Sequence, residues 1–106
     1  MRLRCPYLHG DVELTDERER HIRERHPDLL PKYLDRVADT LCEPDRVRRS
    51  VRVANARLFS RWFDDIMGGK HAVVVVVSEV GTARQWVMTA YLARKLGPGD
   101  VEWQRN

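Results

Sequence analysis

The sequence predicts an α+β fold in which two N-terminal helices pack on one face of a four-stranded antiparallel meander sheet. Three patterns support this: five consecutive valines, apolar residues at helical spacing before them, and apolar residues that alternate on either side. Consecutive β-branched residues favour a strand over a helix. The segment Ala72–Ser78 is therefore expected to be the central strand, and it is too short to span a membrane.

The central strand has to be covered on both faces. Side chains alternate along a strand, so Val74 and Val76 point to one face and Val73, Val75 and Val77 to the other. Two upstream helices can cover the first face. The second needs a ligand cleft, a protein partner or a second copy of the chain, and we expect function there.

Length and composition indicate one domain spanning residues 1–106. Hydrophobic residues make up 42% and charged residues 33% of the chain, which suits a globular protein with one core. The first ten residues lack the apolar stretch of a signal peptide, so we expect a cytoplasmic protein. Cys5 and Cys42 have no metal-site spacing, and free thiols are favoured over a disulfide.

The first helix is expected from Thr15 to Pro27. Thr15 is a suitable N-cap, and the acidic residues after it suit the start of a helix. Ile22 is the only apolar residue inside this segment. Any face of the helix that packs against the rest of the protein must therefore include histidine and arginine side chains. Residues 1–14 are interpreted as an N-terminal arm or short strand.

The second helix is expected to be the main core helix. It should be capped by Asp28, tolerate Pro31 in its first turn, and end at Cys42-Glu43-Pro44. Its apolar residues recur at helical spacing: Leu30, Leu34, Val37 and Leu41.

Four strands with short connections are expected after this helix, which is typical of an antiparallel meander. Their expected ranges are Asp45–Val53, Arg57–Asp64, Ala72–Ser78 and Arg84–Leu92. Residues 97–106 are interpreted as a tail in which only Trp103 docks.

Arginine is unusually frequent on the first two predicted strands. Three of the nineteen basic residues are lysine, so sixteen are arginine, and we expect three of these to contact a substrate backbone: Arg46, Arg48 and Arg52. A guanidinium can bind a phosphate through two hydrogen bonds. This pattern favours RNA as a partner with salt-dependent binding, although a codon bias towards arginine explains the composition equally well.

His21 and His26 are the candidate proton-transfer residues. Histidine titrates near neutral pH and can act as acid or base in RNA cleavage. Both lie on a helix that is too polar for a simple packing role, although a half-exposed helix histidine is the plainer interpretation. Their separation places the rings about 140° apart, unlike the HExxH pair, so we expect no metal and no other cofactor.

The last predicted strand offers two hydroxyl groups on one face. Thr89 and Tyr91 point to the side opposite Met88 and Ala90, where they could bond a phosphate. Threonine and tyrosine are also favoured in strands for packing reasons, so both interpretations stay open.

Several short motifs, taken in order, resemble a known family. His21, Arg25-His26-Pro27, Glu43-Pro44-Asp45, Leu58-Phe59, Gly69-Lys70 and the segment Val87–Tyr91 are similar to the phage-type nuclease-like domains of the barnase/EndoU/colicin/RelE superfamily. The resemblance covers about Arg18 to Leu92. It implies N-terminal helices on a four-stranded antiparallel sheet, with a metal-independent ribonuclease site on the open face.

The resemblance also implies residue roles. His21 would be the helix histidine, with His26 beside it, Arg61 the sheet cation and Thr89 the last-strand hydroxyl. The position of the cation stays open, because two neighbours are alternatives to it: Arg57 and Lys70.

Two main hypotheses follow. The first is an endoribonuclease, as a toxin or phage-derived effector, that cleaves RNA by transesterification and stabilises the phosphorane with arginine. The second is a non-catalytic nucleic-acid-binding or protein-interaction domain, such as one partner of a toxin and antitoxin pair or a homodimer through the open sheet face. Geometry separates them, because the active site requires His21, Arg61 and Thr89 to converge on one concave patch.

Overall fold

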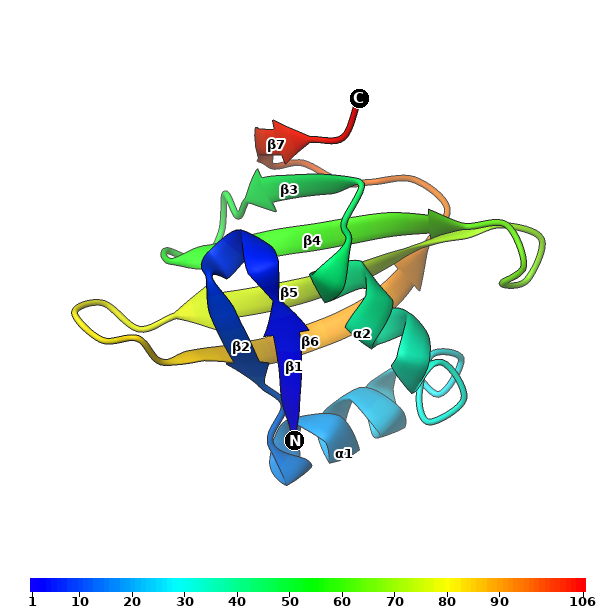
Figure 1. The fold of residues 1–106 in the computed structure, drawn as a ribbon. Helices are drawn as coiled ribbons and strands as arrows, with labels where there is room; N and C mark the ends of the chain where they lie inside the picture. Colours follow the sequence, from blue (N-terminus) through cyan, green and yellow to red (C-terminus); the bar gives the residue numbers. More distant parts are fainter.

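The sheet of this protein has seven strands and is accompanied by two helices (Figure 1). The computed structural model describes residues 1–106. The strands are β1 (Arg2–Cys5), β2 (Gly10–Glu13), β3 (Arg46–Arg49), β4 (Ala56–Phe63), β5 (Lys70–Ser78), β6 (Gln85–Ala93) and β7 (Asp100–Gln104). The helices α1 (Asp16–Arg25) and α2 (Leu34–Cys42) follow β2, and a 3-10 turn, Pro6–Leu8, joins β1 to β2. None of the helices has the length and apolar character needed to span a membrane.

The prediction of a four-stranded antiparallel meander is wrong. The order across the sheet is β1-β2-β6-β5-β4-β3-β7, and β2 runs parallel to β6, so the sheet is mixed. The four expected strands do pair as antiparallel neighbours from β3 to β6. The N-terminal segment, interpreted as an arm or short strand, and the predicted tail supply the other three strands, which extend both edges of the sheet (Figure 1).

The sequence leaves the added strands undecided or misses them because they are short: residues 1–14 are predicted as an arm or short strand, and β7 is not predicted. β1 and β2 contain four residues each, and only two side chains of β1, Leu3 and Cys5, are buried. Two alternations do not distinguish a strand from a loop. Strands of this length are stable only because they pair with an existing sheet edge, which is a tertiary effect.

One face of the sheet, called here the helix face, packs against α2. Val37 and Leu41 of α2 share a core with Phe59 of β4 and with Val74 and Val76 of β5. Complete burial of such side chains stabilises the fold by about 1.5–3 kcal/mol each. The predicted direction of Val74 and Val76 and the predicted role of the second helix are therefore confirmed.

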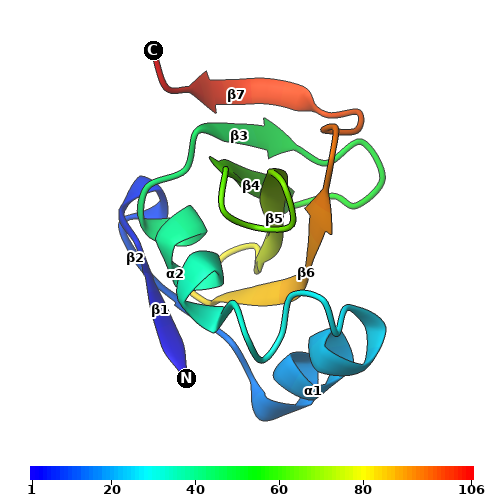
Figure 2. The same cartoon turned by 90° about the vertical axis from the view of Figure 1, so that its right-hand side faces the viewer.

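The expectation that both helices pack on this face is wrong. α1 lies beside β6, away from α2 (Figure 2). Ile22 is its single buried residue and reaches the same core as α2. A helix with one apolar residue has no stripe wide enough to cover a sheet face, which explains its marginal position.

The ends of the helices follow local sequence signals in part. The Oγ of Thr15 accepts the backbone N–H of Arg18 at 3.1 Å, which confirms the predicted N-cap. α2 also ends at Cys42 as expected, with Glu43 at the C-cap. Its start is different, because residues 27–33 form turns and the helix begins at Leu34 instead of after Asp28.

The opposite face of the sheet, called here the crossover face, is covered by the chain itself. β6 and β7 are separated by three strands, so residues 94–99, called here the strap, cross over this face (Figure 2). Val73 and Val75, which point to the crossover face, are only 1% and 6% exposed. The second face of the valine strand is therefore enclosed within one chain.

Candidate functional site

Arg48 is the only buried charged residue of the protein. It lies on the crossover face of β3, opposite Leu58 of β4, and is 2% exposed. Its Nη1 donates a hydrogen bond to the carbonyl oxygen of Gly97 in the strap at 2.6 Å. Its Nε and Nη2 have no hydrogen-bond partner. These two nitrogens form one edge of the guanidinium, the edge that can bind an oxyanion through two parallel hydrogen bonds.

No carboxylate neutralises Arg48. None of the ion pairs of the chain includes it. Burial lowers the pKa of the Arg48 guanidinium; nearby Tyr91 opposes this shift and nearby Arg46 adds to it. An unpaired buried cation costs several kcal/mol of folding free energy. Within the protein, Arg48 therefore donates only to neutral backbone carbonyl oxygens of the strap.

Arg48 lines a pocket of about 260 Å³, called here the Arg48 pocket. The walls come from β3, the loop after it, Tyr91 of β6 and the strap residues Gly97 and Pro98. Arg52 lies on this loop and not on the strand, because β3 ends at Arg49. No acidic residue lines the pocket, so its potential is positive and suits an anion.

A smaller pocket of about 140 Å³ lies at the other end of β3 and is called here the Ser60 pocket. Arg46 and Ser60 face each other across β3 and β4 and line it together with His71. Ser60 is 1% exposed, and its Oγ has no hydrogen-bond partner. Burial lowers the pKa of His71, an effect that nearby Asp45 opposes and nearby Arg46 strengthens, so the neutral imidazole is favoured.

Trp62 stands beside the Ser60 pocket on the same face. Its ring makes an edge contact with His71 at a centroid distance of 4.8 Å, and the residue is 42% exposed. The indole N–H donates a hydrogen bond to the carboxylate of Asp64. The ring also packs against Gly69, in the turn between β4 and β5, so closely that a side chain at this position would collide with it. An ordered, exposed aromatic ring therefore lies next to the arginines.

The crossover face brings together six of the ten site residues predicted from the sequence. Arg46, Arg48, Arg52 and Tyr91 line the two pockets, and Thr89 lies on the same face opposite Val75. From α1, His26 approaches this face as well. Its ring lies 5.9 Å from that of Tyr91, centroid to centroid.

The remaining predicted residues lie elsewhere. Arg57 and Arg61 pair with Val76 and Ala72, so both leave β4 on the helix face. Arg61 donates to the carbonyl oxygen of Glu43 at 3.3 Å. Because Thr89 leaves the sheet on the crossover face, Arg61 and Thr89 do not converge on one patch. The period of two along each strand places them on opposite faces.

Two further predicted residues, Lys70 and His21, lie outside both pockets. The ammonium group of Lys70 donates to the carbonyl oxygen of Met67 at 3.3 Å, at the start of β5. His21 is half-buried on α1. Neither of them lines the Arg48 pocket or the Ser60 pocket.

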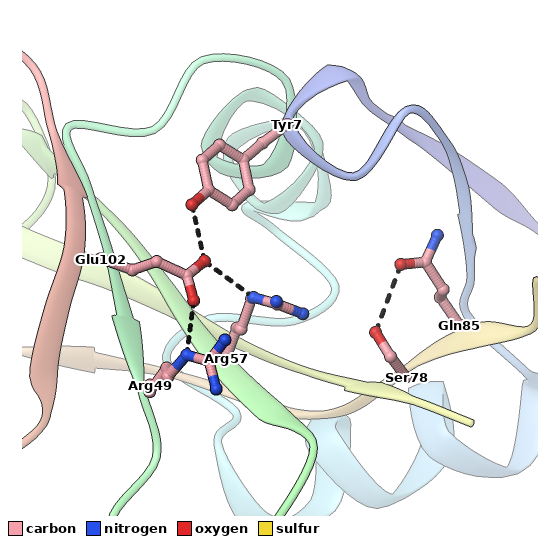
Figure 3. Close-up of polar contacts among 6 residues, drawn as sticks. All are labelled: Tyr7, Arg49, Arg57, Ser78, Gln85 and Glu102. Atoms are coloured by element: carbon pink, nitrogen blue, oxygen red, sulfur yellow. Dashed lines mark hydrogen bonds and ion pairs between the residues drawn. The ribbon is translucent and has the colours of Figure 1, made fainter. Parts of the chain in front are cut away.

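Arg57 belongs to a structural cluster centred on Glu102 of β7 (Figure 3). The carboxylate of Glu102 accepts hydrogen bonds from Tyr7 Oη at 2.6 Å, Arg49 Nε at 2.7 Å and Arg57 Nε at 2.9 Å. Burial alone would raise the pKa of Glu102, but these three donors outweigh it and hold the pKa below its usual value. The cluster fastens β7 to β3, β4 and the turn after β1.

Ser60, His71 and the strap were missed as functional candidates. The alternation Leu58, Ser60, Trp62 already places Ser60 away from the helix face, and His71 shares the parity of Val73 and Val75. Those patterns could have identified both residues. No local sequence pattern identifies the strap. Its position over Arg48 depends on where β6 and β7 pair within the sheet.

Comparison with known proteins yields no match: no protein family, no curated protein and no solved structure corresponds to this chain. No group of three or more histidine, cysteine, aspartate or glutamate side chains is placed to hold a metal ion. The fold and the site together define an α+β protein with two arginine-lined pockets under a strap that joins two strands of its mixed sheet.

Proposed function

We propose that the protein binds single-stranded RNA on the crossover face, with a backbone phosphate held in the Arg48 pocket. The observation that carries this proposal is the buried guanidinium of Arg48, which has a free edge and no acidic partner. A phosphate would accept two hydrogen bonds from that edge and neutralise the charge. Binding would thus offset a cost that the free protein carries.

Access to Arg48 requires a movement of the strap. The two free nitrogens, Nε and Nη2, are shielded from solvent, and Nη1 already donates a hydrogen bond to the carbonyl oxygen of Gly97. Gly99 lets the strap lie this close, since a Cβ there would come within 3.2 Å of the Cβ of Arg48. The strap is joined to Arg48 through carbonyl hydrogen bonds only, so a phosphate competes well for the guanidinium.

Trp62 supports a single strand over a duplex as the ligand. An exposed aromatic ring beside cationic side chains can stack an unpaired base, whereas the bases of a duplex are stacked on one another. Stacking of this kind contributes about 1–3 kcal/mol per base and tolerates any sequence.

The proposal predicts that Arg52→Met weakens binding of a fluorescently labelled, single-stranded RNA by about 3- to 10-fold. Arg52 is an exposed residue at the rim of the Arg48 pocket, so its loss should also reduce the slope of log affinity against log salt by about one. Fluorescence anisotropy at several salt concentrations measures both quantities.

Arg4→Met is the matched control for this experiment. Arg4 is an exposed arginine on β1, at the far edge of the sheet from β3, and its loss should change neither affinity nor salt slope. Equal effects of the two substitutions would mean that RNA is attracted only by net charge. Absence of binding by the wild-type protein at low salt would remove the proposal.

A second candidate function is metal-independent cleavage of the bound RNA. The contact between His26 and Tyr91 supports it, because Tyr91 also lines the Arg48 pocket. His26 would act as acid or base, and Arg48 would stabilise the charge of the phosphorane. This catalytic set differs from the one that the resemblance to the barnase/EndoU/colicin/RelE superfamily implies, because Arg61 and Thr89 lie on opposite faces of the sheet.

For this second candidate, His26→Ala should slow RNA cleavage in the presence of EDTA by roughly 100- to 10,000-fold. Gel electrophoresis of a labelled RNA measures the rate. His9→Ala, at an exposed histidine after the 3-10 turn, is the control and should cleave like the wild type. If wild-type protein binds RNA but leaves it intact, only the binding function stands.

A further inference from the structure

The Ser60 pocket contains a second unsatisfied polar group that one bound phosphate in the Arg48 pocket does not explain. Ser60 Oγ is buried, has no hydrogen-bond partner and lines the smaller pocket. A buried hydroxyl without a partner costs about 1–3 kcal/mol. The two pockets therefore share one feature: each contains a buried donor for which the protein supplies no acceptor.

The charges around the Ser60 pocket also favour an anion. Arg46 takes part in none of the ion pairs of the chain. Asp45 is the only acidic residue of the lining, and its carboxylate is occupied: it accepts the backbone N–H of Trp62 at 2.8 Å and lies 3.7 Å from Arg105. Because Arg105 neutralises Asp45, the positive charge of Arg46 has no acidic partner in the pocket.

The spacing of Arg46 and Arg48 along β3 is similar to the repeat of a nucleic-acid backbone. Arg46 and Arg48 lie two residues apart on the same face of β3, which corresponds to about 6.6 Å along the strand. Neighbouring phosphates of an extended single strand are separated by a comparable distance. Leu96 of the strap lines the Ser60 pocket and Gly97 the Arg48 pocket, so the two sites lie under one continuous segment.

We propose that the Ser60 pocket is a second phosphate subsite, so that the protein recognises two consecutive phosphates. This inference rests on the proposed RNA-binding function and specifies its ligand. The hydroxyl of Ser60 and the guanidinium of Arg46 bind one phosphate, and Arg48 binds the next. Trp62, at the margin of the Ser60 pocket, stacks the base that adjoins the first phosphate.

Isothermal titration calorimetry with two matched ligands tests this subsite. A nucleoside 3′,5′-bisphosphate can occupy both pockets, whereas the corresponding 5′-monophosphate can occupy one. We expect the wild-type protein to bind the bisphosphate at least tenfold more tightly. Ser60→Ala and Arg46→Met should each reduce affinity for the bisphosphate about tenfold and remove most of the preference for the bisphosphate over the monophosphate.

The outcomes separate the subsite from the proposed function. Equal affinity of the wild-type protein for the two ligands, or a preference that survives both substitutions, overturns the second subsite while the Arg48 site stands. Failure of both ligands to bind overturns both proposals. Thermal unfolding of the Ser60→Ala protein, which removes an unsatisfied hydroxyl, should show an unchanged or higher melting temperature, which excludes misfolding as the cause of lost affinity.

Discussion

Arg48→Met is expected to weaken RNA binding by at least tenfold while making the folded protein more stable. The binding loss follows from removing a bidentate, charge-assisted contact, which contributes about 1.5–3 kcal/mol. The gain in stability follows from replacing a buried, unpaired cation by an apolar side chain of similar length, which we expect to stabilise the fold by about 1 kcal/mol or more. Anisotropy and urea unfolding measure the two effects.

The opposite signs of these effects make the experiment informative. A residue retained for packing loses stability when it is replaced, whereas a residue retained for a ligand can gain stability at the expense of function. Arg57→Met provides the matched control on the helix face of the same sheet. It breaks a hydrogen bond to Glu102, so it should lower stability and leave RNA affinity unchanged. Unchanged RNA affinity in the Arg48→Met protein would refute the proposed site.

Glu102→Gln is expected to destabilise the protein by about 2 kcal/mol at pH 7 and to lose this effect as the pH falls through the folded-state pKa of Glu102, which is lowered from its usual value. The carboxylate accepts three hydrogen bonds, two of them from arginines, and each charge-assisted bond contributes about 1.5–3 kcal/mol. A glutamine has one acceptor oxygen in place of two and cannot neutralise the arginines. Urea unfolding of both proteins across the acid range measures the difference.

The pH dependence has a definite sign. The folded-state pKa of Glu102 lies below its usual value, near 4.3 for an unfolded glutamate, so the unfolded state binds the proton more readily. The stabilisation is complete above the unfolded pKa and is lost as pH falls through the folded pKa. A difference between the two proteins that did not shrink as the pH is lowered through the acid range would show that the charge of Glu102 is not what stabilises β7.

Several features of the fold could be predicted because their causes are local. The valine run, the N-cap at Thr15 and the end of the second helix at Cys42 all depend on neighbours within a few residues. The start of α2 at Leu34 was not predictable in this way. Turns between residues 27 and 33 bury Leu29 and Leu30 in place of the first helical turn expected there.

The site was predictable only as a set of residue types. Alternation placed Arg46 and Arg48 on one face of a strand, and it also separates Arg61 and Thr89 once the pairing of β4, β5 and β6 is known. No sequence pattern reveals that Arg48 is buried and unpaired. That state arises because residues 94–99, distant in sequence, cross over β3.

The sequence by itself determined the central strand, the antiparallel pairing of its neighbours and the abundance of arginine, since these follow from side-chain shape, alternation and composition. Tertiary structure decided which arginines are available. The path of the chain from β6 to β7 buries Arg48 without an acidic partner, whereas the docking of β7 brings Glu102 to Arg57. Both results depend on contacts between residues about 45 to 50 positions apart, which local propensity does not encode.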